Sequence, residues 1–431
     1  MNEKEWHISK YNLTAKIPES GRWVVVNLMT GACVPMNAAT LYAMSKLSEL
    51  PKDTELLQKL AKLGIITDYD ELAELEAMGR MACTFCHSIE LTICPTMGCN
   101  FDCPYCFEDH RLEKMTEKTQ NDILRLTEKL LYISKAKNLR ITWFGGEPLL
   151  ALDIIGSLSD RLMGICDKKD IQYSAGIITN GYLLDQDVVD MLSRVRVTTA
   201  QITLDGIGEV HDRTRHLANG DPSFDRIADN LRTLKIPFEV SVRHNVHLEN
   251  IDQIEPVRHF VKELSEVSNN NIRYYPSPVS DNKRSRNRGS DLTIICGNDD
   301  SLVGIWRDSD RLSRATGYYC GAQTLWSIGI DALGNLHKCW ETVDKPEESF
   351  ASAADWDPMN PFETAVDPDK LTSFLNTSGV PDDECRDCIW LPACRGGCPY
   401  ARLHNKKNCL PYKNNPEEFV KMVYADRQCG K

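Results

Sequence analysis

Six short apolar runs alternate with helical stretches between residues 89 and 279, and this alternation constrains the fold more than any other feature. The runs are rich in β-branched residues: IELTIC (89–94), NLRITWF (138–144), IQYSAGIIT (171–179), VTTAQITL (197–204), FEVSVRHNV (238–246) and IRYYPSPV (272–279). Stretches such as NDILRLTEKLLYI (121–133) separate them at helical spacing. Strands alternating with helices indicate an α/β fold with a parallel sheet, and six such units predict a partial (β/α)6 barrel instead of the closed eight-stranded one.

In such folds ligands collect at the carboxyl ends of the strands, and the loop after residues 89–94 contains CNFDCPYC. Its cysteines, Cys99, Cys103 and Cys106, are spaced C-x3-C-x2-C. Thiolates are the usual ligands of iron–sulfur clusters, so three of them in one loop can hold three irons of a cubic cluster and leave one iron open. A structural zinc loop is the alternative for the spacing alone.

The loop after the next predicted strand contains Gly145, Gly146, Glu147 and Pro148. Two glycines let a backbone approach a ligand closely, and a carboxylate can accept hydrogen bonds from an ammonium group. This loop and the cysteine loop together resemble the radical S-adenosylmethionine (SAM) family. A zinc loop gives no reason for the glycine loop, so the pair of motifs favours the iron–sulfur interpretation.

The resemblance implies a catalytic 4Fe–4S cluster on the three cysteines, with the amino and carboxylate groups of SAM on the open iron. It also implies SAM contacts from Gly145, Gly146 and Glu147 at the amino group, from Tyr105 near the adenine, and from Asn180 and Arg215 in the stretches ITNG (178–181) and ITLDGIGEVHDRTR (202–215). A surface salt bridge is the alternative role for Arg215. We assign no chemistry to His211, and the sequence identifies no general base.

Cysteines return near the carboxyl end in GNLHKC (334–339), which is G-x4-C, and in CRDCIWLPACRGGC (385–398), which is C-x2-C-x5-C-x3-C. These spacings resemble the SPASM extension of radical SAM enzymes, which carries two auxiliary 4Fe–4S clusters. The resemblance assigns an outer cluster to Cys385, Cys388, Cys394 and Cys409, and an inner cluster to Cys320, Cys339 and Cys398.

The chain departs at two positions from the anaerobic sulfatase-maturing enzymes of the same family. Those enzymes have a further cysteine where this chain has Arg314, and they place their proposed base, an aspartate, where it has Trp340. Tryptophan cannot take a proton. The inner cluster is therefore expected to have an open iron, or to recruit Cys296 or Cys429 as its fourth ligand.

The amino-terminal region predicts a small α+β unit. RWVVVN (22–27) and ACVPMN (32–37) form a predicted hairpin, followed by two helices with N-caps at Asn37 and at Asp53 or Thr54. This is the outline of a winged-helix module, whose strand edge can accept an extended peptide. A plain packing domain is the alternative. Peptide maturases that resemble this chain often begin with a leader-binding winged-helix element, which favours the first interpretation.

The length of 431 residues predicts two or three domains. We expect a winged-helix-like leader-recognition element at 1–82, a radical SAM core at 83–290, a bridging region at 291–317 and a SPASM domain at 318–431. The first twenty residues contain no apolar run, so we expect a cytoplasmic protein that does not bind a membrane. In that compartment 17 cysteines favour metal sites over disulfides, and a net charge of -12 argues against nucleic-acid binding.

The resemblance implies that one electron cleaves SAM to a 5'-deoxyadenosyl radical, which removes a hydrogen atom from a substrate C–H bond. The auxiliary clusters would accept the electron released when a new bond closes. We therefore expect a maturase that installs an intramolecular thioether or carbon–carbon cross-link in a ribosomally made precursor peptide, supplied with electrons by a reductant such as flavodoxin or ferredoxin. The alternatives are formylglycine formation in a sulfatase, which Arg314 and Trp340 disfavour, peptide epimerisation, and a non-catalytic iron–sulfur or zinc protein.

Overall fold

The computed structural model describes residues 5–18, 20–47, 54–85, 87–279, 319–406 and 409–429. The chain forms two compact units, each built from segments far apart in sequence. The first unit contains residues 1–84, 297–320 and 377–431, and the second contains 85–296 and 321–376. The predicted bridging region, Cys296 and Arg314 lie outside the described residues.

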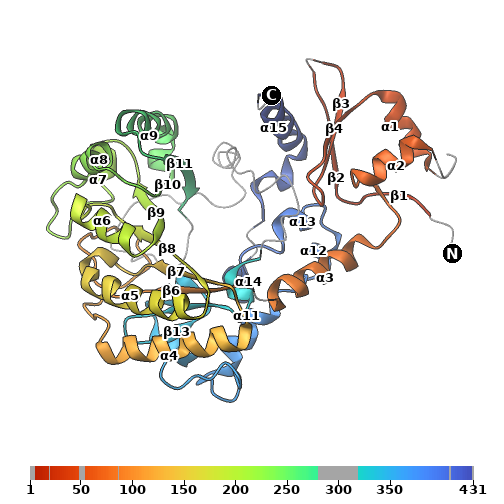
Figure 1. The fold of residues 1–431 in the computed structure, drawn as a ribbon. Coiled ribbons are helices and arrows are strands. Elements are labelled where there is room, and N and C mark those ends of the chain that lie inside the picture. Colours follow the sequence, from red (N-terminus) through yellow and green to blue (C-terminus); the bar gives the residue numbers. More distant parts are fainter. Residues whose placement is uncertain are drawn as a thin grey trace. The chain divides into compact units, whose positions relative to one another are not determined.

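The second unit is built on a nine-stranded sheet of order β11-β10-β9-β8-β7-β6-β12-β13-β14 (Figure 1). Six of its strands are parallel neighbours: β6 (Ser88–Ile93), β7 (Asn138–Trp143), β8 (Gln172–Thr179), β9 (Val197–Leu204), β10 (Glu239–Val246) and β11 (Ile272–Pro278). They coincide with the six predicted runs, and the sheet remains open at both ends. The predicted α/β fold with a partial barrel is confirmed.

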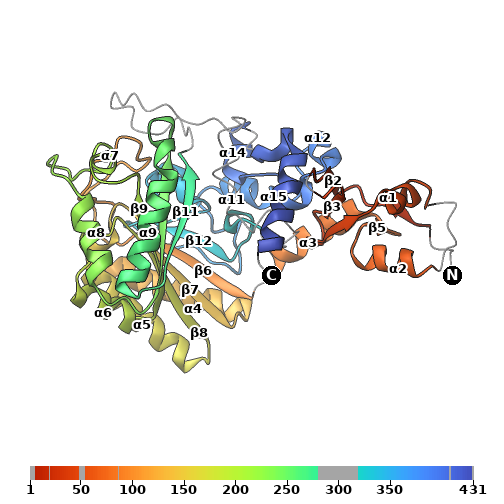
Figure 2. The ribbon, with the colours of Figure 1, turned by 90° about the horizontal axis from the view of Figure 1, so that it is seen from above.

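Helices connect these strands and pack on the sheet: α4 (Glu117–Ser134), α5 (Leu152–Lys168), α6 (Gln186–Arg194), α8 (Phe224–Thr233) and α9 (Ile254–Ser268). Local chemistry decides where they begin. Thr116 accepts a hydrogen bond from the Thr119 amide at the start of α4, and Asp185 does the same for Val188 at α6. Figure 2 shows α9 lying along β11, and α9 contacts both β10 and β11.

Residues 321–376 extend the same sheet. Strand β12 (Ser327–Ile330) pairs in parallel with β6, and β13 (Asn335–His337) and β14 (Ala351–Ser352) follow as antiparallel strands. The region that the sequence groups with the carboxyl-terminal cysteines therefore contributes strands to the core sheet. The predicted start of a SPASM domain at residue 318 remains a prediction.

The first unit contains a three-stranded antiparallel sheet of order β2-β3-β4, formed by β2 (Asn12–Lys16), β3 (Trp23–Asn27) and β4 (Cys33–Met36). A second small sheet pairs β1 (His7–Ile8) with β5 (Ile66–Thr67). Helices α1 (Ala38–Ser45) and α2 (Glu55–Lys62) begin at the predicted caps Asn37 and Thr54, and α3 (Glu71–Thr84) follows. The predicted hairpin is present, and the unpredicted β2 makes it a three-stranded sheet.

The carboxyl-terminal segment of the first unit contains α12 (Asp383–Asp387), α13 (Leu391–Cys394), α14 (Pro399–Leu403), the 3-10 helix η9 (Pro411–Asn414) and α15 (Pro416–Cys429). It shares one hydrophobic core with the amino-terminal sheet. Leu13 and Val24 from the sheet cluster with Trp390, Tyr412 and Phe419. Because burial of apolar surface drives folding, each segment depends on the other for stability.

Among the helices that the structure describes, none combines the length and apolar character needed to cross a membrane.

Candidate functional site

A cavity of about 300 Å³ lies in the second unit, where consecutive parallel strands end. Residues from five strand ends contribute to its lining. They include Cys99, Cys103, Tyr105 and Cys106 from the loop after β6, Gly145 and Gly146 after β7, Thr179 and Asn180 at the end of β8, Gln201 and Thr203 of β9, and Arg243 and Asn245 of β10, together with Arg215 and Trp340. The strand-end rule therefore located the cavity correctly from the sequence. Of the predicted SAM-binding residues, Glu147 alone does not line it.

All three cysteines of the first loop line this cavity. A turn brings two of them together, because the Cys106 amide donates to the Cys103 carbonyl at 3.1 Å. Burial raises the pKa of each of the three thiols. The protein alone thus favours neutral thiols, and a bound cation is what would stabilise thiolates here.

The spacing of these thiols does not suit a single zinc ion. Zinc–sulfur bonds of about 2.3 Å in a tetrahedral site place the sulfurs about 3.8 Å apart. Within the described part of the chain, the only group that brings three potential ligand atoms within 4.8 Å of one another is Cys106, Glu108 and His110. At least two of the three cysteine sulfurs therefore lie more than 4.8 Å apart, which suits a larger cubic cluster better than a single zinc ion.

The two glycines after β7 pass directly over the cysteine loop. A Cβ atom at Gly145, where φ is +107°, would lie 2.4 Å from the Thr96 carbonyl oxygen, and one at Gly146 would lie 2.4 Å from that of Gly98. Real Cβ atoms do not approach backbone so closely. The glycines are therefore required for contact between the two loops as well as for an open cavity wall.

Glu147 is fully buried and joins two strand ends. Its carboxylate accepts hydrogen bonds from the Leu149 amide at 3.0 Å, the Thr179 hydroxyl at 2.7 Å and the Asn180 amide at 2.7 Å. Burial raises its pKa, and these hydrogen bonds act in the opposite direction. Its observed contacts hold Asn180 at the cavity, and its predicted contact with the SAM amino group remains a prediction.

Tyr105 connects the cysteine loop to the ends of β9 and β10. Its hydroxyl donates to Asp205 Oδ2 at 2.5 Å and accepts from Arg215 Nη1 at 2.9 Å and from Asn245 Nδ2 at 3.2 Å. Asp205 also accepts a hydrogen bond from Thr214 at 2.8 Å. Sequence reasoning missed Asp205 and Asn245, although Asp205 immediately follows a predicted strand, which was the available signal.

Arg215 lines the cavity within this network. Burial alone would lower its pKa, but Tyr105, Cys103 and Asp205 outweigh that effect and raise it. Its Nε atom has no hydrogen-bond partner among the described residues, which leaves a donor for a bound carboxylate. The cavity position disfavours the surface salt bridge.

His211 is completely buried and accepts a hydrogen bond from the Asp205 amide at 3.2 Å. It does not line the cavity. Its contacts are structural.

Trp340 contributes an aromatic wall to the cavity. Its ring lies 5.4 Å from that of Phe144, which in turn stacks on Phe107 at 6.5 Å. The Trp340 side chain remains 43% exposed, so a bound substrate can reach it. The wall offers apolar contact and no proton acceptor.

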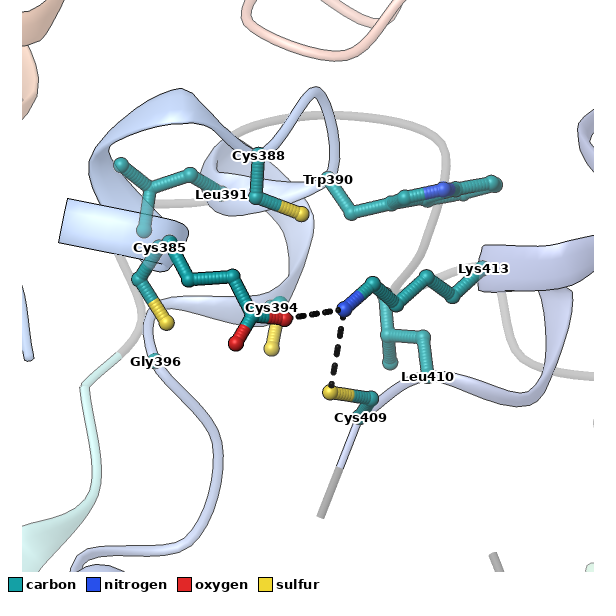
Figure 3. Close-up of a pocket in the computed structure, with 10 residues that line it drawn as sticks. Cys385, Cys388, Trp390, Leu391, Cys394, Gly396, Cys409, Leu410 and Lys413 are labelled. Atoms are coloured by element: carbon teal, nitrogen blue, oxygen red, sulfur yellow. Dashed lines mark hydrogen bonds and ion pairs between the residues drawn. The ribbon is translucent and has the colours of Figure 1, made fainter. Parts of the chain in front are cut away.

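The four cysteines predicted for the outer cluster line one pocket of the first unit: Cys385, Cys388, Cys394 and Cys409. Figure 3 shows their sulfur atoms turned toward a common space. The chain reverses between Cys394 and Cys398 through three residues of positive φ, at 52° for Arg395, 82° for Gly396 and 78° for Gly397. Glycine adopts positive φ without strain, so the two glycines of CRGGC allow the turn that places Cys394 in the pocket. Four thiols around one space fit a metal cluster.

The cysteines predicted for the inner cluster are divided between the units. Cys320 and Cys398 belong to the first and Cys339 to the second. Cys429 ends α15, and its side chain lies outside the described part of the structure, as does Cys296. The inner cluster and its fourth ligand remain predictions.

Comparisons with known proteins match the part of the chain that contains this site. The family model of the radical SAM superfamily matches residues 93–261. The cysteine-type anaerobic sulfatase-maturating enzyme of Clostridium novyi is 23% identical over 364 residues, which cover 77% of this chain and 92% of that enzyme. The enzyme of the same name from Clostridium perfringens strain 13 is 23% identical over 370 residues, or 76% and 94% of the two chains.

Two kinds of solved structure have a similar fold. One is native anSMEcpe with bound AdoMet and the Kp18Cys peptide, with a TM-score of 0.59 and 20% identity over 79% of this chain and 98% of that one. The other is SuiB of Streptococcus suis bound to the precursor peptide SuiA, with a TM-score of 0.53 and 16% identity over 94% of this chain and 98% of that one.

When bound, SAM and its cluster supply one-electron cleavage of SAM and hydrogen-atom abstraction. The residues that line the cavity would hold and orient them and exclude water. The cysteine loop, the glycine loop and the Tyr105 network all lie within the matched span. Residues 93–261 are a radical SAM domain, of the superfamily whose members bind a 4Fe–4S cluster and SAM, and the protein that contains this domain is an enzyme.

Proposed function

We propose that the protein is a peptide maturase that installs an intramolecular thioether or carbon–carbon cross-link in a ribosomally made precursor peptide. One observation carries this proposal. The fold of SuiB in complex with its precursor peptide matches 94% of this chain, whereas that of anSMEcpe matches 79%. A match over 94% of the chain must include most of residues 1–82. This amino-terminal region is therefore part of the similarity to a protein that binds a precursor peptide.

The amino-terminal sheet supports leader binding through strand β4. This strand ends the sheet, and no described strand pairs with its outer edge. The Asn27 amide donates to the Ala32 carbonyl, and backbone groups of alternate residues face opposite sides of a strand. Cys33 and Pro35 therefore present their backbone groups outward. Proline has no N–H, so Cys33 provides the remaining donor for an added peptide strand in β4.

The residue at position 340 of the cavity supports cross-linking over formylglycine formation, because it is not a carboxylate that could act as a base. Trp340 stands where sulfatase-maturing enzymes place an aspartate, and it lines the cavity beside the cysteine loop. The four-cysteine pocket would hold a cluster that accepts the electron released when a cross-link closes. Flavodoxin or ferredoxin would supply the electron that starts each turnover.

The test is to incubate the reconstituted enzyme with SAM, a one-electron reductant and candidate peptides encoded beside its gene. We expect one peptide to lose a pair of hydrogen atoms, with no backbone fragmentation between the linked residues in tandem mass spectrometry. Formation of 5'-deoxyadenosine should rise with that peptide. If none changes mass while a short sulfatase peptide containing cysteine or serine gains an aldehyde, the cross-linking proposal is wrong.

Sulfatase maturation is the second candidate, and the two sulfatase-maturating relatives favour it. Conversion of cysteine or serine to formylglycine gives an aldehyde that hydroxylamine traps, whereas a cross-linked peptide contains none. Epimerisation is separated by mass, because inversion of a stereocentre leaves it unchanged.

Leader binding is tested by point substitution, because deletion of residues 1–82 would remove part of the core that surrounds Trp390 and Phe419. Cys33→Pro removes the outward N–H of β4, and Cys33→Val is the matched control that retains it. We expect Cys33→Pro to weaken binding of the modified peptide at least tenfold and Cys33→Val to leave it near native. Equal affinity in both variants, with unchanged melting temperatures, would contradict leader binding at β4.

A further inference from the structure

A lysine and a glutamate share the pocket of the four outer cysteines. Lys413 Nζ lies 3.8 Å from Cys409 Sγ, within hydrogen-bond range for sulfur, and 2.9 Å from Glu384 Oε1. Figure 3 shows the Lys413 side chain extending across the pocket toward Cys409. The ammonium group therefore contacts one predicted ligand, while a carboxylate holds it in place.

Local structure positions both charged groups. Lys413 lies in η9, where its amide donates to the Leu410 carbonyl at 3.0 Å, so the turn brings the lysine back over Cys409. Glu384 lies in α12, which begins where Asp382 accepts a hydrogen bond from the Cys385 amide at 2.8 Å. The pair thus joins the two segments that supply the pocket cysteines.

Charge beside a cluster changes its reduction potential. An added electron makes a cluster with its thiolate ligands more negative, so a nearby cation favours the reduced state and a nearby anion disfavours it. A hydrogen bond to a ligand sulfur acts in the same direction as the cation. Lys413 is 34% exposed and Glu384 is 60% exposed, so solvent screens the carboxylate more than the ammonium group.

We propose that Lys413 and Glu384 set the reduction potential of the cluster held by Cys385, Cys388, Cys394 and Cys409, Lys413 raising it and Glu384 lowering it. The inference rests on the auxiliary cluster of the proposed function. Lys413 and Glu384 thus act on the outer cluster through their charges, and neither residue lines the SAM cavity.

The test is an EPR-monitored redox titration with dithionite and mediators on reconstituted full-length protein. Cys99, Cys103 and Cys106 are replaced by Ala in every sample to remove the catalytic signal. The signal lost when Cys385, Cys388, Cys394 and Cys409 are all replaced by Ala identifies the outer cluster. We expect Lys413→Met to lower its equilibrium constant for reduction about tenfold, which is about 59 mV for one electron. Glu384→Gln should raise the potential, and Lys413→Arg should stay near native.

The matched control is an ion pair of the same chemistry on α2, where Lys59 Nζ lies 2.6 Å from Glu55 Oε1. Lys59→Met and Glu55→Gln change the net charge equally and should leave the potential of the outer cluster unchanged. Iron content equal to that of the parent shows that a shifted variant still holds its cluster.

The outcomes separate two failures. Iron that does not fall when Cys385, Cys388, Cys394 and Cys409 are all replaced by Ala would mean that the pocket holds no cluster, and both the auxiliary-cluster assignment and this inference would fail. The role of the pair would be overturned if the potential of the pocket cluster were the same in the parent, Lys413→Met and Glu384→Gln. It would also be overturned if the potential shifted in the same direction in both variants. Either result would leave the proposed function intact.

Discussion

The hydroxyl of Tyr105 donates a 2.5 Å hydrogen bond to the carboxylate of Asp205, which lies one hundred residues further along the chain. Tyr105 stands in the sequence between two of the predicted cluster ligands, Cys103 and Cys106, and Asp205 directly follows β9. The same hydroxyl accepts from Arg215, so one group links the cysteine loop, a strand end and a cation in the cavity. The loop predicted to hold the catalytic cluster is therefore joined to the sheet by a side chain that is not one of the predicted ligands.

Tyr105→Phe removes this link without touching a predicted cluster ligand. Asp205 loses its shortest hydrogen bond and Arg215 loses its acceptor, so the free energy of unfolding should fall by about 1–3 kcal/mol. Urea denaturation measures the change, and iron per chain should remain native. A loss of iron with unchanged stability would instead make Tyr105 part of the cluster site.

Gly146→Ala should prevent the glycine loop from lying against the cysteine loop, because the new Cβ would stand 2.4 Å from the Gly98 carbonyl. We expect loss of the catalytic cluster, seen as about four fewer irons per chain, and loss of 5'-deoxyadenosine formation. Gly164→Ala in α5 is the control, since a Cβ there meets nothing within 4 Å. It should stabilise the protein by about 0.5–1 kcal/mol with native iron content. Native iron in both variants would refute the close-contact argument.

Glu147→Gln tests the buried carboxylate that accepts from Leu149, Thr179 and Asn180. Glutamine has one acceptor oxygen in place of two, and its side-chain NH2 group would then face one of these hydrogen-bond donors. We expect a loss of about 1–3 kcal/mol in stability and weaker SAM binding, because the Asn180 amide loses its acceptor. Calorimetric titration with SAM measures the affinity. Native affinity together with reduced stability would show that Glu147 acts on the fold alone.

The buried His244 should make stability fall in mild acid. Burial lowers its pKa from 6.5 to about 4. The unfolded chain therefore takes up the proton first, and the contribution of neutral His244, complete above pH 6.5, is lost as the pH falls toward 4.

The full loss is roughly 3 kcal/mol for this one group. His244→Gln should flatten the curve of unfolding free energy between these pH values. Identical pH dependence in the His244→Gln variant and the native protein would contradict this assignment.

Most of the residues that line the cavity could be predicted from the sequence, because they follow strands with a clear apolar pattern. Cys99, Gly146 and Asn180 each lie within a few residues of a predicted strand end, and parallel strands bring those ends together. The roles of Asp205 and Asn245 could not be predicted, because both depend on a hydrogen bond with the Tyr105 hydroxyl, which is distant in sequence and not indicated by any local pattern.

Other features depend on packing between distant segments. Strand β12 is short and apolar, and only its pairing with β6 makes it part of the core sheet. The shared core of Leu13 with Phe419 joins segments some four hundred residues apart, so residues 1–82 could not be recognised as half of a larger unit. Lys413 follows Cys409 by four residues, and its contact with sulfur depends on the η9 turn.

Iron and sulfide per chain after anaerobic reconstitution test the central claim most directly. A cubic cluster contributes about four irons, so one catalytic and two auxiliary clusters predict about twelve in the native protein and about eight when Cys99, Cys103 and Cys106 are replaced by Ala. About four falling to about zero would contradict the account, because the carboxyl-terminal cysteines would then hold no iron–sulfur cluster and the proposed cross-linking would lose its electron acceptor.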